Sequence, residues 1–233
     1  MIQKKMTFRI LGHLLLLLTA MMLICLIFPI IYGEDDLQAF AITAGITSAV
    51  GGLLMYLGRG ASRKLTRRNG YLIVSLAWII FSIFGMLPFY LSGYIPSITD
   101  AFFETMSGVS STGASILDNI EELPHGLLFW RSLTQWIGGL GIILFTIAVL
   151  PIFGFNGVQM FAAEATGPLH DKVHPRIGVT ARWIWTLYAG LTIILFFLLI
   201  LGDMSWFDSI CHALTATGTG GFSTKQDSIA YYN

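Results

Sequence analysis

Charged residues are scarce in this sequence. They make up 11% of its 233 residues, with 13 Lys and Arg against 13 Asp and Glu, whereas about a quarter of a typical soluble domain is charged. So few charges cannot cover the surface of a water-soluble globule of this size, and 55% of the residues are hydrophobic. The composition therefore predicts an integral membrane protein, and it argues against a disordered chain or a nucleic-acid-binding protein.

Cysteine is also scarce, and the familiar patterns of catalytic and metal sites are missing. The two cysteines, Cys25 and Cys211, lie in or near apolar segments, so no disulfide framework is indicated. The five histidines lack a zinc-ligand spacing such as H-E-x-x-H, and no G-x-S-x-G motif is present. We therefore expect no enzyme, no organic cofactor and no metal site built from side chains.

Apolar runs long enough to cross a bilayer, which takes about 20 residues, occur five times. They cover residues 10–32, 37–58, 71–91, 127–153 and 183–201. The first run could also be a signal peptide, but it is too long and no small-residue cleavage site follows it. The sequence therefore predicts a multi-pass membrane protein.

Basic and acidic residues are segregated between alternate loops. Eleven of the 13 basic residues lie before the first run, between the second and third, or between the fourth and fifth: Lys4, Lys5, Arg9, Arg59, Arg63, Lys64, Arg67, Arg68, Lys172, Arg176 and Arg182. By the positive-inside rule the N-terminus is cytoplasmic. The basic run at residues 59–68 could instead bind anionic lipid head groups.

Two short polar segments follow the third and fifth apolar runs and match each other. When residues 100–115 are laid over 208–223, Asp100 falls on Asp208 and Gly113 falls on Gly221, an offset of 108. Each segment is too short to cross the membrane. The sequence therefore contains an internal repeat of a span, a short segment and a loop.

Each short segment is predicted to be a half-helix followed by a loop. Asp100 and Asp208 suit the N-cap of a helix, residues 101–109 and 209–217 are helix-compatible, and Ser, Thr and Gly then end the helix. Irregular backbone at membrane depth is tolerated only where protein buries it or where it lines a watery cavity. Rings of backbone carbonyls there replace the hydration shell of a potassium-sized cation, and the negative end of each half-helix favours a cation.

Further motifs carry a resemblance to a known family. They are Arg131-Ser-Leu-Thr-Gln-Trp-Ile-Gly-Gly-Leu-Gly141 and Met160-Phe-Ala-Ala-Glu-Ala-Thr-Gly-Pro-Leu-His-Asp-Lys-Val-His-Pro-Arg-Ile177. With the repeats, they make the chain resemble the Trk/Ktr/HKT potassium transporter superfamily, and in particular its TrkH-type potassium uptake subunits. The resemblance implies an all-α membrane fold of span–pore half-helix–span repeats with re-entrant filter loops, arranged with pseudo-fourfold symmetry when complete.

The resemblance also implies a division of the chain. Residues 1–70 would form an N-terminal helix pair and a basic cytoplasmic loop, 71–153 the first repeat, 154–176 a cytoplasmic linker, and 177–233 a second repeat that stops after its filter loop. The remaining C-terminal repeats of the chain would complete the pore. Implied partners are a second copy in a homodimer and a cytoplasmic TrkA-type nucleotide-binding regulator, with the lipid bilayer as surroundings and no nucleic acid.

The implied function is potassium uptake across the bacterial cytoplasmic (inner) membrane, with K⁺ as the transported ion. K⁺ would be held by filter backbone carbonyls only, from Ser110, Ser111, Thr112, Gly113, Gly218, Thr219, Gly220 and Gly221. The alternative is a secondary transporter for a small solute, since such proteins also use discontinuous helices. There, however, half-helix N-termini usually face the substrate.

Polar residues around the half-helices allow more than one interpretation. Glu104 could add negative potential near the pore, but we favour a brace between half-helix and span. Arg131 could repel cations, or it could pair with Glu121 or Glu122. The glycines of the first motif could permit close helix approach or act as hinges; they are Gly138, Gly139 and Gly141.

Overall fold

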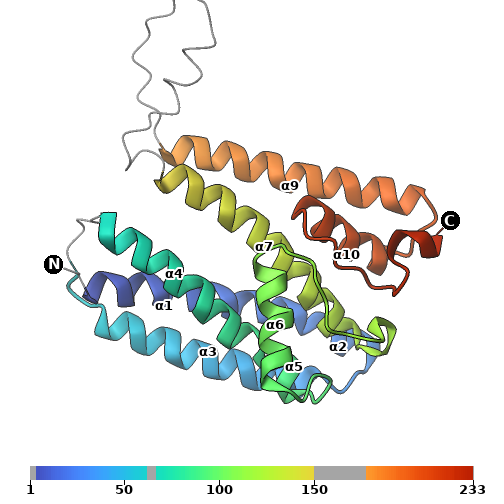
Figure 1. Cartoon of the computed structure of the whole chain (residues 1–233), viewed down its shortest axis with the longest axis horizontal. Coiled ribbons are helices and arrows are strands. Elements are labelled where there is room, and N and C mark those ends of the chain that lie inside the picture. The colour runs from blue at the N-terminus through green and yellow to red at the C-terminus, as the bar shows by residue number, and fades with distance from the viewer. Residues whose placement is uncertain (1–3, 62–66, 150–176, 233) are drawn as a thin grey trace, which may run out of the picture.

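The computed structural model describes residues 4–61, 67–149 and 177–232, and the regular structure in these ranges is helical (Figure 1). The helices are α1 (Lys4–Cys25), α2 (Ile27–Tyr32), α3 (Leu37–Leu57), α4 (Arg67–Gly85), α5 (Leu87–Leu91), α6 (Ile98–Val109), α7 (His125–Val149), α9 (Ile177–Leu201) and α10 (Trp206–Thr217), with 3-10 turns η1 (Ile120–Glu122) and η3 (Ser228–Tyr232). The predicted all-α fold is confirmed.

Within the described ranges, four helical stretches are long and apolar enough to cross a membrane. They are Lys4–Tyr32, Leu37–Leu57, Leu72–Leu91 and Arg182–Leu201, and they correspond to four of the five predicted spans. The fifth, at residues 127–153, forms α7 as far as Val149. Its last residues and the predicted linker at 154–176 lie outside the described residues, as does most of the second family motif.

Proline interrupts two of the spans near their C-terminal ends. The helix breaks at Leu26, between α1 and α2, and again at Met86, between α4 and α5. Pro29 and Pro88 follow these breaks closely. A proline has no N–H to donate, and its ring clashes with the carbonyl four residues earlier, so the helix bends just before it.

The helices pack in an order that puts α7 between the two half-helices. α1 packs along α3 and contacts α4, α6 lies between α4 and α7, and α10 contacts both α7 and α9 (Figure 1). Glycines allow α1 and α3 to approach closely, because a Cβ on Gly12 would lie 2.8 Å from the carbonyl oxygen of Gly51. α6 and α10 are the predicted half-helices, so α7 contacts both repeats.

The loop between α2 and α3 joins the N-terminal helix pair to the start of α7. Glu34 accepts a hydrogen bond from the backbone N–H of His125 (2.8 Å) and lies 2.7 Å from its ring Nδ1. The buried carboxylate of Asp36 lies against Gly126 in the first turn of α7. Burial, together with the nearby charge of Glu34, raises the pKa of Asp36 to about 6. Two carboxylates thus meet the positive end of α7.

Candidate functional site

Both predicted half-helices are present and end where the sequence predicts, α6 at Val109 and α10 at Thr217. The N-cap prediction, however, was wrong. The N-caps are Ser97 and Ser205, whose hydroxyls accept hydrogen bonds from the backbone N–H of Asp100 (3.3 Å) and Asp208 (3.1 Å). The two aspartates are therefore the third residues of their helices.

The serine caps have a simple physical cause. A hydroxyl placed before a helix reaches the N–H of the third helical residue, which has no partner within the helix. Ser205 also donates its hydroxyl to Asp208 Oδ2 (2.7 Å), a second contact between the cap and the third helical residue. The pattern Ser-x-x-Asp occurs in both repeats at the same offset of 108 and could have identified the caps. The aspartates still lie in the first turn, where the helix dipole favours negative charge.

The two half-helices end in the same way. Each closes with a Schellman motif, in which two successive N–H groups donate back to carbonyls of the last turn. The pairs are Ser111 with Gly108 and Thr112 with Ser107 in the first repeat, and Thr219 with Ala216 and Gly220 with Thr215 in the second, at 2.9–3.0 Å. Every donor and acceptor has its counterpart 108 residues later, so the repeat extends to the backbone hydrogen bonds.

Each predicted filter loop, 110–113 and 218–221, contains two left-handed residues. In the first loop they are Ser111 (φ 56°) and Gly113 (φ 76°). In the second loop they are the equivalent residues Thr219 (φ 55°) and Gly221 (φ 89°). Left-handed backbone costs a residue with a side chain about 1–2 kcal/mol, so glycine is the natural choice for the second turn. The repeated conformation shows that the two loops follow one backbone path.

The two loops touch each other. A Cβ added to Gly113 would overlap the carbonyl oxygen of Gly220. The first loop therefore lies directly against the second, although they are far apart in the sequence. The structure brings together all eight residues predicted to supply filter carbonyls, in two adjoining segments.

Glycines on α7 let this helix approach both repeats. A Cβ on Gly138 would overlap the carbonyl oxygen of Val109, the last residue of α6. A Cβ on Gly139 would lie 2.9 Å from the carbonyl oxygen of Gly218, in the second loop. Close approach is thus confirmed at these two positions, whereas a Cβ on Gly141 would meet no described atom within 4 Å.

Glu104 on α6 and Arg131 on α7 form a buried ion pair. Arg131 Nε lies 2.8 Å from Glu104 Oε1, and each residue is 1% exposed. Glu104 also accepts hydrogen bonds from the Ser115 hydroxyl (3.0 Å) and the Ile116 N–H (3.1 Å), both in the segment after the first loop. The interpretation of Glu104 as a brace is confirmed.

The partner predicted for Arg131 was wrong. The Arg131 guanidinium is buried in the protein interior and does not reach Glu121. Glu121 pairs with Lys225 instead, at 3.5 Å. In the interior, Arg131 also donates to the Ser115 hydroxyl (3.2 Å) and to the Ser223 carbonyl (3.1 Å). One side chain of α7 thus contacts the segments that follow both loops.

The second repeat has an equivalent brace, with a histidine in place of the glutamate. His212 corresponds to Glu104, and its Nε2 lies 3.0 Å from the hydroxyl of Ser223, which corresponds to Ser115. The other ring nitrogen, Nδ1, lies 2.8 Å from the Asp208 carbonyl oxygen, which can only accept, so Nδ1 carries a proton. In both repeats, therefore, the half-helix is bonded to the second residue after the filter glycine.

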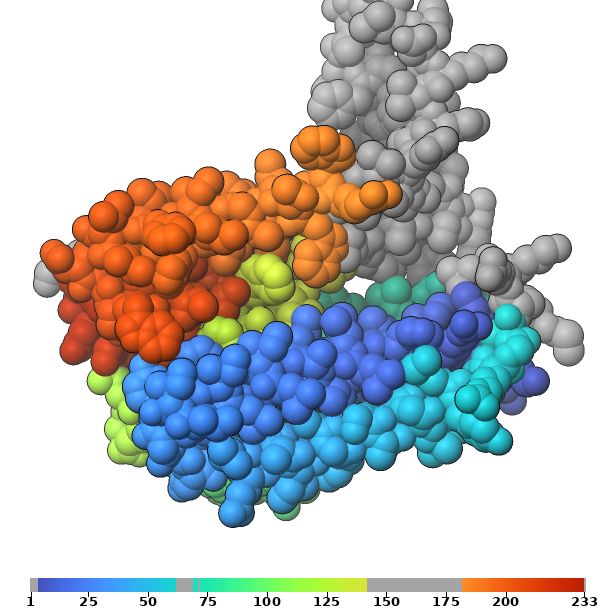
Figure 2. All heavy atoms as spheres, turned by 180° about the vertical axis from the view of Figure 1, so that it is seen from behind, coloured from blue at the N-terminus to red at the C-terminus, as the bar shows by residue number. Residues whose placement is uncertain are grey.

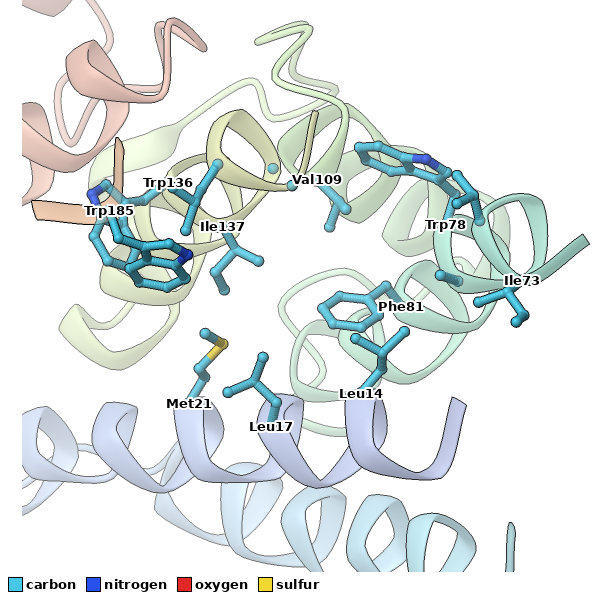
Figure 3. A pocket seen from close by; sticks show the side chains of 15 residues that line it. Leu14, Leu17, Met21, Ile73, Trp78, Phe81, Val109, Trp136, Ile137 and Trp185 are labelled. Atoms are coloured by element: carbon cyan, nitrogen blue, oxygen red, sulfur yellow. The ribbon is translucent and has the colours of Figure 1, made fainter. Parts of the chain in front are cut away.

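A separate cavity of about 280 Å³ opens among α1, α4, α7 and α9. Figure 2 shows the hollow between α1 and α9 on this face, and Figure 3 shows side chains such as Leu17, Phe81 and Trp136 around it. The described residues that line it carry no charge. It offers a cation or a charged solute no side-chain partner of opposite charge, so the loops remain the candidate site.

Comparisons with known proteins agree with this geometry. The sequence profile of TrkH, described as a cation transport protein, matches residues 36–233. The chain is 38% identical over 231 residues to the Trk system potassium uptake protein TrkH of Halomonas elongata and 40% identical over 227 residues to that of Escherichia coli K12. These alignments cover 98% and 97% of the chain, and 48% and 47% of the relatives.

A solved structure has the same fold. The crystal structure of the potassium transporter TrkH from Vibrio parahaemolyticus superposes with a TM-score of 0.86 at 34% identity, covering 99% of this chain and 46% of that one. The chain thus spans about half the length of the relatives it matches. By its sequence profile and its fold, the chain belongs to the TrkH family of cation transport proteins.

Proposed function

We propose that this chain forms about half of a potassium uptake pore of the bacterial cytoplasmic membrane, with K⁺ as the transported ion. The named relatives are potassium uptake proteins, which supports potassium as the cargo. The ligands are backbone carbonyls of the two loops: Ser110, Ser111, Thr112, Gly113, Gly218, Thr219, Gly220 and Gly221. Carbonyl oxygens suit potassium because they replace its hydration shell.

The observation that carries the proposal is the pair of identically folded loops in contact at Gly113 and Gly220. A pore needs such loops to meet around an axis, each presenting the same backbone. α6 and α10 both end at these loops, so the negative ends of their dipoles favour a cation there.

The rest of the assembly follows from the family resemblance. Residues 1–70 act as an accessory helix pair, 71–153 as the first repeat, 154–176 as a cytoplasmic linker and 177–233 as the second repeat up to its filter loop. Further repeats C-terminal to these close the pore with pseudo-fourfold symmetry. A second copy completes a homodimer, and a TrkA-type nucleotide-binding ring docks on the cytoplasmic face. The basic loops support a cytoplasmic N-terminus.

No specific observation favours the alternative of a secondary transporter for a small solute. Such a site presents free half-helix N-termini to its substrate. In this chain both N-termini are capped by their own serines, Ser97 and Ser205. The relatives are named as transport proteins, and we propose no catalytic role.

The test is cation flux through the full-length protein that carries these residues, reconstituted in liposomes. We expect potassium to move down its gradient much faster than sodium, without exchange of an organic solute. Equal sodium and potassium flux would overturn the selectivity, and flux that requires a saturating organic solute would overturn the pore.

A further inference from the structure

Gln135 lies between the two loops and is bonded to both sides. Its side chain is fully buried. Its Oε1 accepts a hydrogen bond from the backbone N–H of Phe222, the residue after the second loop, at 3.0 Å. Its main-chain carbonyl accepts one from the Ser111 hydroxyl of the first loop at 3.3 Å. One residue of α7 therefore contacts both repeats at the level of the loops.

The packing around Gln135 leaves room only for glycine at positions 218 and 220 of the second loop. A Cβ on Gly220 would overlap the side-chain amide of Gln135, and a Cβ on Gly218 would lie 2.6 Å from its carbonyl oxygen. On the other side, its Nε2 lies 3.6 Å from the place a Cβ on Gly113 would take. Among the described residues this Nε2 has no hydrogen-bond partner, so the amide is held by packing and by one bond through Oε1.

That single bond fixes the direction of a filter carbonyl. The peptide between Gly221 and Phe222 is trans, since the described residues contain no cis bond. In a trans peptide the C=O points opposite to the N–H. Because the Phe222 N–H points toward Gln135 on α7, the Gly221 carbonyl points away from α7. Two residues further on, the Ser223 carbonyl is held toward α7 by Arg131.

We propose that Gln135 is a positioning residue that aims the Gly221 carbonyl and holds the two loops in register. This inference rests on the proposed function, because it assigns Gln135 a role in potassium selectivity. Gln135 does not touch the ion; it acts through the backbone of the second loop. Its part is to accept the Phe222 N–H, so any side chain of the same reach that keeps the acceptor preserves the geometry.

The experiment compares Gln135→Met with Gln135→Glu in the full-length protein. Methionine keeps the length and bulk but removes the acceptor, whereas glutamate keeps an oxygen where Oε1 lies. Ser132→Ala is the matched control, because Ser132 is buried on the same helix and its hydroxyl bonds to the Leu128 carbonyl and to the Cys211 side chain, neither of which belongs to a loop. The readouts are the ratio of potassium to sodium flux in liposomes and the potassium-dependent rise of Tm in detergent.

We expect Gln135→Met to lower the flux ratio about five- to tenfold, the effect of one lost hydrogen bond, and to shrink the potassium-dependent rise of Tm. Gln135→Glu should keep both, because a carboxyl buried without a charged partner stays protonated and neutral and still offers Phe222 an acceptor oxygen. Ser132→Ala should also keep both. If Gln135→Met does not fold, Gln135→Asn replaces it, since its amide is too short to reach Phe222. A methionine variant with wild-type selectivity, or equal losses for methionine and glutamate, would overturn the inference. Lack of potassium preference in the wild type would instead overturn the proposed function.

Discussion

Arg131 Nε and Glu104 Oε1 lie 2.8 Å apart in an ion pair that solvent does not reach. The pair joins the first half-helix to α7. The other guanidinium nitrogens donate to the Ser115 hydroxyl after the first loop and to the Ser223 carbonyl after the second. Removing one member of a buried ion pair leaves an uncompensated charge, which costs about 3–5 kcal/mol. The pair is therefore a sensitive point of the fold.

Neutralising Glu104 should destabilise the protein strongly. For Glu104→Gln we expect a loss of about 3–5 kcal/mol, because Arg131 keeps its charge in the interior. Unfolding in detergent, followed by tryptophan fluorescence, measures the loss. Adding Arg131→Gln should cost less than the sum of the two single changes. Glu122→Gln, an exposed change nearby, should stay within about 0.5 kcal/mol of the wild type; a Glu104 variant that behaves like Glu122→Gln would contradict the prediction.

Gly113 and Gly93 both have a left-handed backbone, so alanine substitutions at the two positions can be compared directly. Their φ angles are 76° and 82°, but a Cβ on Gly93 would meet no described atom within 4 Å, whereas one on Gly113 would overlap Gly220. Gly93→Ala should cost only the backbone penalty of about 1–2 kcal/mol and keep the flux ratio. Gly113→Ala should cost more and lower potassium selectivity in liposomes. Equal behaviour of the two variants would show that contact between the loops is unimportant.

The serine caps can be separated from the aspartates in the first repeat. Ser97→Ala should lower the unfolding free energy by about 1 kcal/mol, the usual effect of losing an N-cap. Asp100→Ala should cost only about 0.5 kcal/mol, because the exposed Asp100 side chain acts through the helix dipole. Thermal unfolding of both variants gives the comparison. A larger loss for Asp100→Ala would restore the aspartate as the cap.

Asp36 should give the protein a pH dependence of known sign. Burial raises its pKa from 3.8 to about 6, so between these values the folded chain binds more protons than the unfolded chain. Stability from this group is then present at low pH and lost as the pH rises through about 6. Asp36→Asn removes that titration, so the stability of the wild type relative to this variant should fall as the pH rises. Asp35→Asn removes an exposed neighbouring charge that contributes less to the raised pKa than burial and Glu34 do, so it should move the profile only slightly.

The features predicted from sequence were those that depend on local composition. Apolar runs identified the spans, and the change from helix-forming residues to Ser, Thr and Gly located the helix ends at Val109 and Thr217. The offset of 108 identified the repeat because both loops turn through a left-handed residue at the same place, and each therefore has a glycine there, Gly113 and Gly221. The N-caps were assigned to Asp100 and Asp208 because aspartate is a good cap by itself. The Ser-x-x-Asp spacing instead favours serine as the cap.

The residues that hold the loops could not be predicted in the same way. Glu104 meets Arg131 across 27 positions, and Gln135 meets Phe222 across 87. Such contacts depend on how the helices pack, which neither periodicity nor composition determines. One signal was available: Arg131 and Gln135 are four residues apart, hence on one face of a helix, in a segment otherwise suited to lipid. Polar residues aligned in that way indicate a buried surface.

The position of α7 also sets an order of assembly. Arg131 and Gln135 belong to the first repeat, yet they bond to the backbone that follows the second loop. During synthesis α7 leaves the ribosome before α10, so the surface on which the second loop settles is already inserted when that loop emerges. If α7 is inserted incorrectly, the second loop therefore lacks the surface on which it folds, even though the sequence of the second repeat is intact.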